Sequence, residues 1–261
     1  MAIHRKAEFV KIPSDSERFA DQCREEIIAQ GNDSLLSEAT KEWRGRARKH
    51  RYTYHFSWLG RPIIQYPQDI VAMQELIWSI KPDLIIETGI AHGGSLILSA
   101  SILELNAACG GAPNAQVLGV DIDIRPHNRA AIEAHPLSRR ISMLQGSSTS
   151  AEIVEEVKAK AKGRQRVLVF LDSSHTHDHV LAELHAYAPL TSAGSYCVVF
   201  DTSIEDAPAE AFADRPWGPG NNPKTAVREF LKSHPAFEID EQIHNKLLIT
   251  VAPDGYLKRI A

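Results

Sequence analysis

Short apolar runs alternate with amphipathic segments between residues 80 and 202. The runs rich in β-branched residues are predicted as strands and cover residues 83–88, 116–123, 140–146, 166–174 and 196–202. Apolar residues at three- and four-residue spacing predict helices between them: Leu96, Ala100, Leu103 and Ala107; Ile153, Val154 and Val157; Val180, Leu184 and Tyr187. Strands that alternate with helices and are apolar almost throughout indicate a parallel sheet covered on both faces.

The region after residue 223 completes this pattern. It predicts a helix over 224–234, followed by two runs, 237–243 and 245–253, that lie close enough in sequence to form an antiparallel hairpin. The predicted fold class is therefore α/β: a Rossmann-like doubly wound sheet, mostly parallel, with an antiparallel C-terminal edge strand.

Residues 1–55 are polar and rich in charge, with helical spacing and no strand-like run. We expect an N-terminal helical extension over 1–55 and one catalytic domain over 56–261. Within the extension, Lys41 to Arg51 holds six Lys or Arg residues against one Glu. Three interpretations stay open: a solvated helix face, an anion-binding flap over an active site, and nucleic-acid binding, which ranks third because the remaining chain is mildly acidic.

Composition narrows the functional class. The 261 residues are 43% hydrophobic and 24% charged, with a net charge of -4, so the chain as a whole does not attract nucleic acid or membrane. Cys23, Cys109 and Cys197 are widely spaced and form no CxxC motif, which argues against a disulfide framework or zinc knuckle. The first residues, MAIHRKAEF, resemble no secretion signal, and no apolar stretch is long enough to span a membrane. A cytoplasmic protein is expected.

The loop ETGIAHGGS, residues 87–95, follows the first predicted strand of the sheet. A P-loop requires GxxxxGK[ST], and Ser95 stands where the lysine belongs. A dinucleotide fingerprint requires GxGxxG, and Ala91 replaces the middle glycine. ATP is thereby excluded and NAD or FAD becomes a weak second choice.

S-adenosylmethionine fits the remaining pattern, because it carries a sulfonium and an amino group but no phosphate. Glu87 is placed to face the cationic methionine part, and the glycines allow close approach of the backbone. Asp121, at the end of the next strand, is the predicted acceptor for the ribose hydroxyls, with Asp123 as the weaker alternative. The small polar residues from Gln145 to Ser148 are predicted to contact the adenine. The predicted cofactor site comprises Glu87, Gly89, His92, Gly93, Gly94, Ser95, Asp121, Gln145, Gly146, Ser147 and Asp172.

Two further strands end in carboxylates, Asp172 and Asp201, at the edge of the sheet where such folds bind ligands. Adjacent carboxylates repel unless a cation or proton lies between them, and Mg²⁺ prefers such oxygen ligands. Glu205 is the candidate third ligand, and Thr202 and Asp206 are nearby, although 205–206 is equally well a surface turn. His175, three residues after Asp172, is placed to act as a general base.

The run HTHDH, residues 175–179, also invites comparison with zinc hydrolases. Its spacing is one residue short of H-x-H-x-D-H, and it begins a predicted helix, so His179 is expected to turn toward solvent or packing. A zinc hydrolase is therefore disfavoured.

Several long blocks, among them ETGIAHGGS, GVDIDIRPHNR, LDSSHTHDHVLAEL and DRPWGPGNNPKTAVREFL, resemble the cephalosporin hydroxylase (CmcI-like) and rhamnosyl O-methyltransferase family over about residues 55–260. The resemblance implies a class I S-adenosylmethionine-dependent methyltransferase with a Mg²⁺ site, often assembled into homo-oligomers. By motif position, Asp172 and Asp201 would hold the metal and His175 would lie beside them. One position departs from the family pattern: Phe200 stands where Glu is expected, so Glu205 or water must supply the third ligand.

The family name also raises a hydroxylase as an alternative. An Fe(II) facial triad needs His-x-Asp/Glu, and none of the twelve histidines is followed two positions later by an acidic residue. A catalytically silent protein that binds S-adenosylmethionine is the other alternative.

The favoured hypothesis is in-line attack of an acceptor hydroxyl on the sulfonium methyl, with Mg²⁺ bound by Asp172 and Asp201 and with His175 as base. A small sugar-containing acceptor with adjacent hydroxyls is favoured. The turn-rich loop from Asp214 to Lys224 is predicted to be a lid, in which Trp217 either stacks on the sugar or packs on the core.

Overall fold

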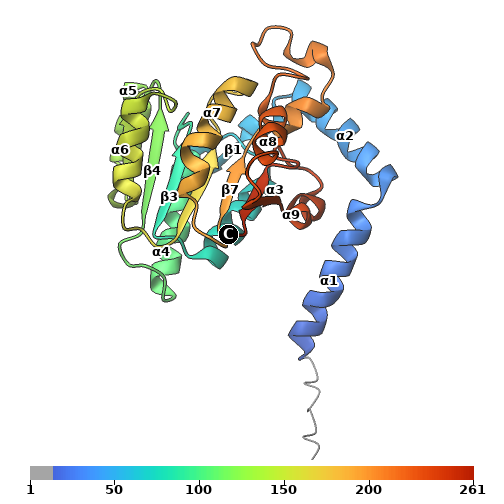
Figure 1. The fold of residues 1–261 in the computed structure, drawn as a ribbon, viewed down its shortest axis with the longest axis horizontal. Coiled ribbons are helices and arrows are strands. Elements are labelled where there is room, and N and C mark those ends of the chain that lie inside the picture. The colour runs from blue at the N-terminus through green and yellow to red at the C-terminus, as the bar shows by residue number, and fades with distance from the viewer. Residues whose placement is uncertain (1–13) are drawn as a thin grey trace, which may run out of the picture.

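A seven-stranded sheet forms the centre of the protein (Figure 1). The computed structural model describes residues 14–261. Along the sheet the order is β5-β4-β3-β6-β7-β9-β8. The strands are β3 (Leu84–Thr88), β4 (Gln116–Asp121), β5 (Ile141–Gln145), β6 (Val167–Leu171), β7 (Tyr196–Val199), β8 (Phe237–Ile239) and β9 (Tyr256–Arg259). The first five pair in parallel, and β9 pairs antiparallel with both β7 and β8. The predicted fold class is confirmed.

Helices cover both faces of the sheet, as the apolar strands predict. One face carries α3 (Pro67–Ile80), α4 (Gly94–Ala108), α5 (Pro126–Glu133) and α9 (Glu241–Leu247); the other carries α6 (Ala151–Ala161), α7 (His177–Tyr187) and α8 (Pro223–Leu231). Successive residues of β3 point to opposite faces: Ile85 packs with the first layer, and Leu84 and Ile86 pack with the second. The result is a three-layer α/β/α domain.

The C-terminal hairpin differs in detail from the prediction. Residues 241–247 form α9 rather than a strand, because Asp240 accepts a hydrogen bond from the Gln242 amide as N-cap, and Ile243 and Leu247 turn toward the core. The strand that pairs with β8 is therefore β9, later in the chain than the predicted run 245–253. Consequently β9 is the antiparallel strand one place inside the edge, and β8 at the edge runs parallel to β7.

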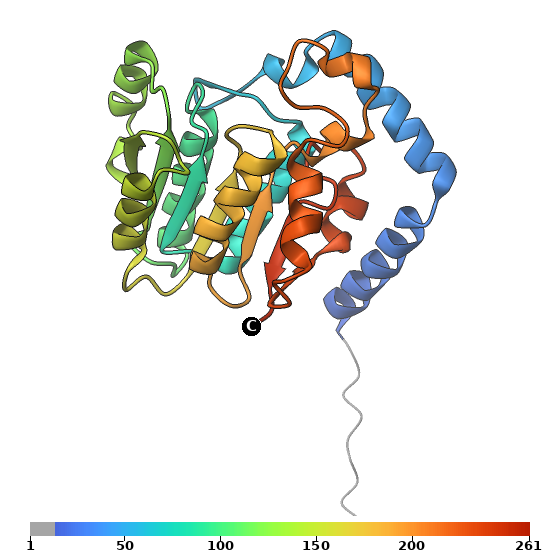
Figure 2. The same cartoon turned by 45° about the horizontal axis from the view of Figure 1, so that its top comes forward.

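The described part of the N-terminal region is helical, as predicted. It comprises α1 (Asp15–Gly31), α2 (Ser34–Lys49) and the 3₁₀ helix η1 (Tyr52–His55), followed by a small hairpin of β1 (Phe56–Trp58) and β2 (Arg61–Ile63). Figures 1 and 2 show α1 and α2 as an arm along one side of the domain. The division into an extension over 1–55 and a domain over 56–261 stays a prediction, and residues 1–13 lie outside the described part.

Among residues 14–261, no helix is both long enough and apolar enough to cross a lipid bilayer. All three cysteines are free.

Candidate active site

A cavity of about 950 Å³ opens at the carboxyl ends of the central strands. Three groups of residues line it: the ligand edge of the sheet, the hairpin region near β2, and the segments around η1 and after β7. The lining includes Arg48, Arg51, Tyr52, Tyr54, Gln65, Gly89, Ala91, His92, Gly94, Ser95, Asp121, Ser147, Ser148, Asp172, Ser173, His175, His179, Asp201, Phe212, Asp214, Arg215 and Trp217. The sheet therefore brings most of the predicted cofactor and metal residues to one cavity.

The glycines of the loop between β3 and α4 are required by the protein itself. Gly89 has a φ of 88°, and a Cβ there would overlap the main-chain oxygen of Asp172. A Cβ on Gly94 would overlap the carbonyl of Pro62, and one on Gly93 would overlap the Ile132 side chain. Gly93 does not line the cavity. The sequence pattern predicts that these glycines allow close approach of the cofactor, whereas in the structure a Cβ at each would meet protein atoms.

Glu87 lies beneath the loop and is only 2% exposed. Ser95 Oγ donates a hydrogen bond to its Oε1, while Oε2 is buried without a partner. Burial raises the pKa of Glu87 to about 8, and the Ser95 hydrogen bond opposes that rise. Ser95 lines the cavity and Glu87 does not. A ligand amine or hydroxyl at this point would therefore meet Ser95 first, with the carboxylate behind it.

Asp121 holds the tip of the same loop. Its Oδ2 accepts from the amides of Ile90 (2.7 Å) and Ala91 (3.3 Å), and its Oδ1 accepts from the amide of Asp123 (3.0 Å). A carboxylate offers about four lone-pair sites, so Asp121 keeps capacity for a further donor from the cavity. The side chain of Asp123 is 70% exposed, and Asp123 does not line the cavity.

The predicted adenine residues divide into two groups. Ser147 and Ser148 line the cavity, whereas Gln145 is exposed elsewhere and Gly146 backs onto Ile153. Gln145 and Gly146 are therefore not at the cavity wall, because the chain turns from β5 into α6 at this point and only its tip reaches the cavity.

Asp172, His175 and Asp201 form the candidate metal centre. One ligand atom from each lies within 4.8 Å of the others, and His175 Nε2 is 3.2 Å from Asp201 Oδ2. Burial, followed by the nearby charge of Asp201, raises the pKa of Asp172 well above its usual range. Two carboxylates at this separation fit a divalent cation, because such an ion offsets the repulsion between them, and the His175 imidazole lies beside them.

Gln65 completes this centre from the turn before α3. Its Nε2 donates to Asp172 Oδ2 (3.1 Å), and its Oε1 is buried without a partner. The sequence gives little signal for this residue, because Gln65 belongs to no motif and reaches Asp172 from 107 positions away in the chain.

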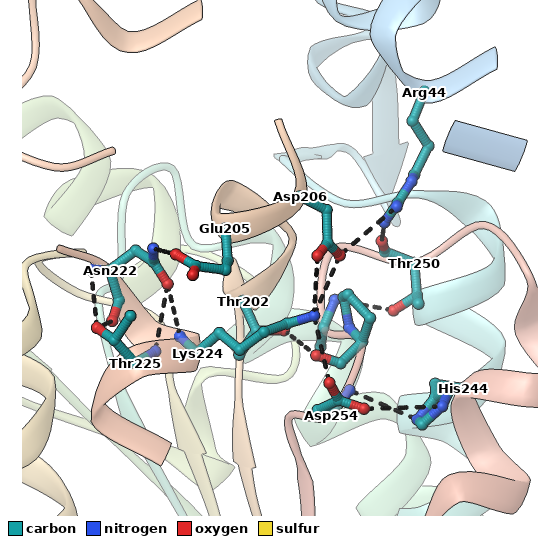
Figure 3. Close-up of polar contacts among 12 residues, drawn as sticks. Arg44, Thr202, Glu205, Asp206, Asn222, Lys224, Thr225, His244, Thr250 and Asp254 are labelled. Carbon is teal, nitrogen blue, oxygen red and sulfur yellow. Dashed lines mark hydrogen bonds and ion pairs between the residues drawn. The ribbon is translucent and has the colours of Figure 1, made fainter. Parts of the chain in front are cut away.

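Glu205 does not join the metal centre. Its carboxylate accepts a hydrogen bond from Asn222 Nδ2 (Figure 3). It also accepts one from the Gly220 amide (2.8 Å) and lies 3.6 Å from Arg228. Thr202 is turned away as well, since its hydroxyl donates to the carbonyl of Pro253 (2.6 Å). Asp172 and Asp201 are therefore the carboxylates that could hold a cation, with His175 beside them, and Glu205 instead fastens the loop before α8.

A buried ionic network holds the 3₁₀ helix η4 (Thr202–Asp206), which follows Asp201 directly (Figure 3). Lys224 Nζ, whose residue is 4% exposed, lies 3.1 Å from Asp206 Oδ2 and 3.2 Å from Asp254 Oδ2. Arg44 of α2 enters the same network: it donates to the carbonyl of Thr250 (3.2 Å) and lies 3.9 Å from Asp206. The network fixes α2 against the end of β7 and the start of α8.

Trp217 and His179 both lie at the cavity wall. Trp217 lines the cavity and meets the His175 ring edge-on at 4.8 Å between ring centres, so the predicted lid loop lies over the metal centre. His179 does not turn away: its Nε2 lies 3.1 Å from Ser148 Oγ and 3.0 Å from Ser173 Oγ at the cavity wall. The first turn of α7 thus presents both His175, just before it, and His179 to the cavity.

Comparisons with known proteins identify the family of the chain. The rhamnosyl O-methyltransferase/CmcI family model matches residues 50–260. Rhamnosyl O-methyltransferase of Mycobacterium tuberculosis is 30% identical over 239 residues, which cover 90% of this chain and 89% of that protein. The Mycobacterium leprae protein of the same name is 28% identical, covering 91% and 96% of the two chains.

Solved structures share the fold. A CmcI structure described as an apo structure aligns with a TM-score of 0.54 at 20% identity, covering 80% of this chain and 77% of that one. A second, described as cmcI-D160 Mg-SAM, aligns with a TM-score of 0.53 at 19% identity, covering 80% and 78%.

Proposed function

The chain belongs to the rhamnosyl O-methyltransferase/CmcI family of S-adenosylmethionine-dependent O-methyltransferases, and we propose that it methylates a hydroxyl of a sugar-containing acceptor with the help of Mg²⁺. One observation carries this proposal: the Asp172–His175–Asp201 cluster and the loop from Gly89 to Ser95 line the same cavity. A donor at the loop and an acceptor at the cluster would therefore face each other.

The methyl-donor half of the site would be formed by the loop, Asp121 and the serines after β5. Ser95, backed by Glu87, offers hydrogen-bonding groups to the amino-acid part of the donor, and the free capacity of Asp121 suits a ribose hydroxyl. The name of the CmcI structure with Mg and SAM supports both cofactors.

The acceptor half would centre on His175. Asp172 and Asp201 would hold the cation, and Gln65 orients Asp172 through its amide. When bound, Mg²⁺ polarises an acceptor hydroxyl and S-adenosylmethionine supplies an activated methyl group. His175 Nε2, held beside Asp201 and against Trp217, is placed to accept the hydroxyl proton. The cluster can bind adjacent hydroxyls together, so a sugar diol is favoured, in agreement with the names of the mycobacterial relatives.

The test is methyl transfer from labelled S-adenosylmethionine to a panel of glycosides. Removal of metal with EDTA is expected to abolish transfer, and Mg²⁺ to restore it; full activity without metal would refute the role of Mg²⁺. His175→Ala is expected to lower the rate about 10²–10⁴-fold, which is the usual contribution of a general base. The exposed His127 of α5 provides the matched control, His127→Ala, which should retain the wild-type rate.

Binding measurements provide readouts separate from activity. Asp172→Asn should lose Mg²⁺ binding and methyl transfer, whereas Asp178→Asn, which changes an exposed carboxylate on α7, should retain Mg²⁺ binding and methyl transfer. A wild-type protein that binds S-adenosylmethionine tightly but transfers no methyl group to any glycoside would point to the silent binding protein instead. Assembly into homo-oligomers in the cytoplasm also remains part of the proposal, to be checked by sedimentation and fractionation.

A further inference from the structure

Three arginines at the mouth of the cavity have no role in the proposed chemistry. Arg48 lies on the last turn of α2, Arg51 follows that helix, and Arg215 belongs to the segment after β7. All three line the cavity. Figure 2 shows α2 and the segment after β7 converging at this end of the molecule.

Each of these guanidinium groups lies over an aromatic ring. Arg48 is 5.2 Å from the ring centre of Phe212, Arg51 is 4.1 Å from that of Tyr54, and Arg215 is 5.6 Å from that of Trp217. Within residues 14–261, none of the three pairs with a carboxylate. An aromatic ring holds a guanidinium in place but leaves its N–H donors available at the ring's edge.

Arginines on nearby helical surfaces behave differently. Arg46, two residues before Arg48 on α2, pairs with Glu42 at 2.6 Å, and Arg129 of α5 lies 3.5 Å from Glu133. The cavity mouth carries one acidic side chain on the same segments, Asp214, against the three arginines. Deeper in the cavity lie Asp121, which accepts hydrogen bonds from three main-chain amides, and Asp172 and Asp201, whose charges a divalent cation would offset. The mouth is therefore locally positive in a chain whose net charge is -4.

The position of Arg48 is built into the fold. Arg44, one helical turn earlier, is 8% exposed and anchors α2 through Thr250 and Asp206 (Figure 3). Residues four apart lie on the same helix face, so this anchor directs Arg48 toward the cavity. Arg46 and Lys49 of the same helix are exposed to solvent.

We propose that Arg48, Arg51 and Arg215 recognise an anionic group on the acceptor, so that the sugar methylated by this enzyme carries a phosphate or a carboxylate. The inference rests on the proposed function for the identity of the site. Guanidinium groups bind both anions through paired N–H donors, and the neighbouring rings of Tyr54, Phe212 and Trp217 would contact the apolar faces of the attached group.

Binding of an inorganic anion tests this without knowledge of the acceptor. Pyrophosphate is titrated calorimetrically into the full chain with S-adenosylhomocysteine and EDTA present, so that no metal ion bridges the anion. Wild type should bind, more weakly as salt rises, and Arg48→Gln/Arg51→Gln should weaken binding at least tenfold. The matched double variant Arg46→Gln/Lys49→Gln removes the same charge from the same helix and should bind within twofold of wild type. Absence of wild-type binding, or equal loss in both variants, would overturn the inference.

Two further arms separate the possible outcomes. S-adenosylhomocysteine affinity is expected to be the same in wild type and in Arg48→Gln/Arg51→Gln; a selective loss would assign the arginines to the donor and overturn the inference.

In the transfer assay, a glycosyl phosphate and a uronic acid glycoside are compared with the neutral glycoside of the same sugar. A lower KM for one anionic form, with the advantage reduced at least tenfold by Arg215→Gln, identifies which anion is recognised. If the neutral glycoside is used equally well, the inference fails while the proposed methyl transfer stands; if no sugar is methylated but pyrophosphate binds as expected, the proposed function fails instead.

Discussion

Replacing Gly89 with alanine tests whether the loop after β3 is shaped by the protein or by its ligand. The φ of 88° is unfavourable for any residue with a Cβ, at a cost of about 1–2 kcal/mol. The new Cβ would also lie much closer than 3.0 Å to the main-chain oxygen of Asp172, a separation that Cβ atoms in real structures essentially never show. This oxygen belongs to the backbone and cannot rotate away. Relief of such overlap costs about 1–3 kcal/mol more. The free energy of unfolding should therefore fall by about 2–5 kcal/mol without any ligand.

Gly94→Ala and Gly45→Ala calibrate this result. At Gly94 the overlap with Pro62 is partly offset by the better helix propensity of alanine, about 1 kcal/mol, so a smaller loss of about 0–2 kcal/mol is expected. Gly45 lies inside α2 with open space around it, and alanine there should raise stability by about 1 kcal/mol.

Thermal unfolding of the ligand-free variants is the assay, because each kcal/mol shifts Tm by roughly 2–4 °C in a chain of this size. A Gly89→Ala protein that unfolds at the wild-type temperature but no longer binds S-adenosylhomocysteine would refute this reasoning. The glycine would then serve approach of the ligand, as the motif alone predicts.

Three further predictions follow from buried groups. Burial raises the folded-state pKa of Glu87 from 4.5 to about 8, so its contribution to stability is complete below about pH 4.5, declines as pH rises and is lost above about pH 8. Chemical denaturation between pH 5 and 9 should show wild type losing roughly 4 kcal/mol relative to Glu87→Gln, and parallel curves would contradict this. Lys224→Met removes the cation that Asp206 and Asp254 share, although Arg44 stays 3.9 Å from Asp206, and should cost about 2 kcal/mol by denaturant titration. Lys232→Met breaks an exposed pair and should cost under about 0.5 kcal/mol; equal costs would show that the network around Lys224 contributes little. A thiol reagent should modify the exposed Cys109 rapidly, whereas the buried Cys197, whose pKa is raised by burial, should react only on unfolding; modification of the folded protein at Cys197 would contradict its burial.

Local patterns in the sequence predict the sheet well, because each strand from β3 to β7 is an apolar run between helical segments. The hairpin of β1 and β2 and the helix α5 were not predicted, since their runs are too short to show a period. Residues 245–253 were wrongly predicted as a strand because their composition suits one, but Thr250 and Val251 donate their polar groups to the buried carboxylate of Asp69 instead. This carboxylate is distant in sequence, so no local pattern reveals it.

The residues of the candidate site also divide into those that local sequence patterns predict and those that only tertiary packing brings to the cavity. Residues at the ends of strands, such as Asp121, Asp172 and Asp201, could be found from sequence because parallel strands end at one edge of the sheet. Gln65 could not, since it reaches the cavity from the turn before α3 through tertiary packing. Arg48 lies in the basic run from Lys41 to Arg51, for which an anion-binding flap over an active site was one of three interpretations, but only the packing of α2 distinguishes it from its neighbours. Glu205 was a reasonable candidate by proximity along the chain, but a 3₁₀ turn after Asp201 directs it to Gly220 instead.

The position of β9 has a consequence for the order in which the protein assembles. β9 supplies the only described link between β7 and β8, yet it lies about 60 residues after β7 in the chain. Until it docks, the outer edge of β7 stays unpaired and β8 has no strand to join. Closing so long a loop carries an entropic cost before its contacts form, which slows folding. We therefore expect the last slow step of refolding to be the insertion of β9, and the unpaired edge of β7 to be the point at which incompletely folded chains associate with one another.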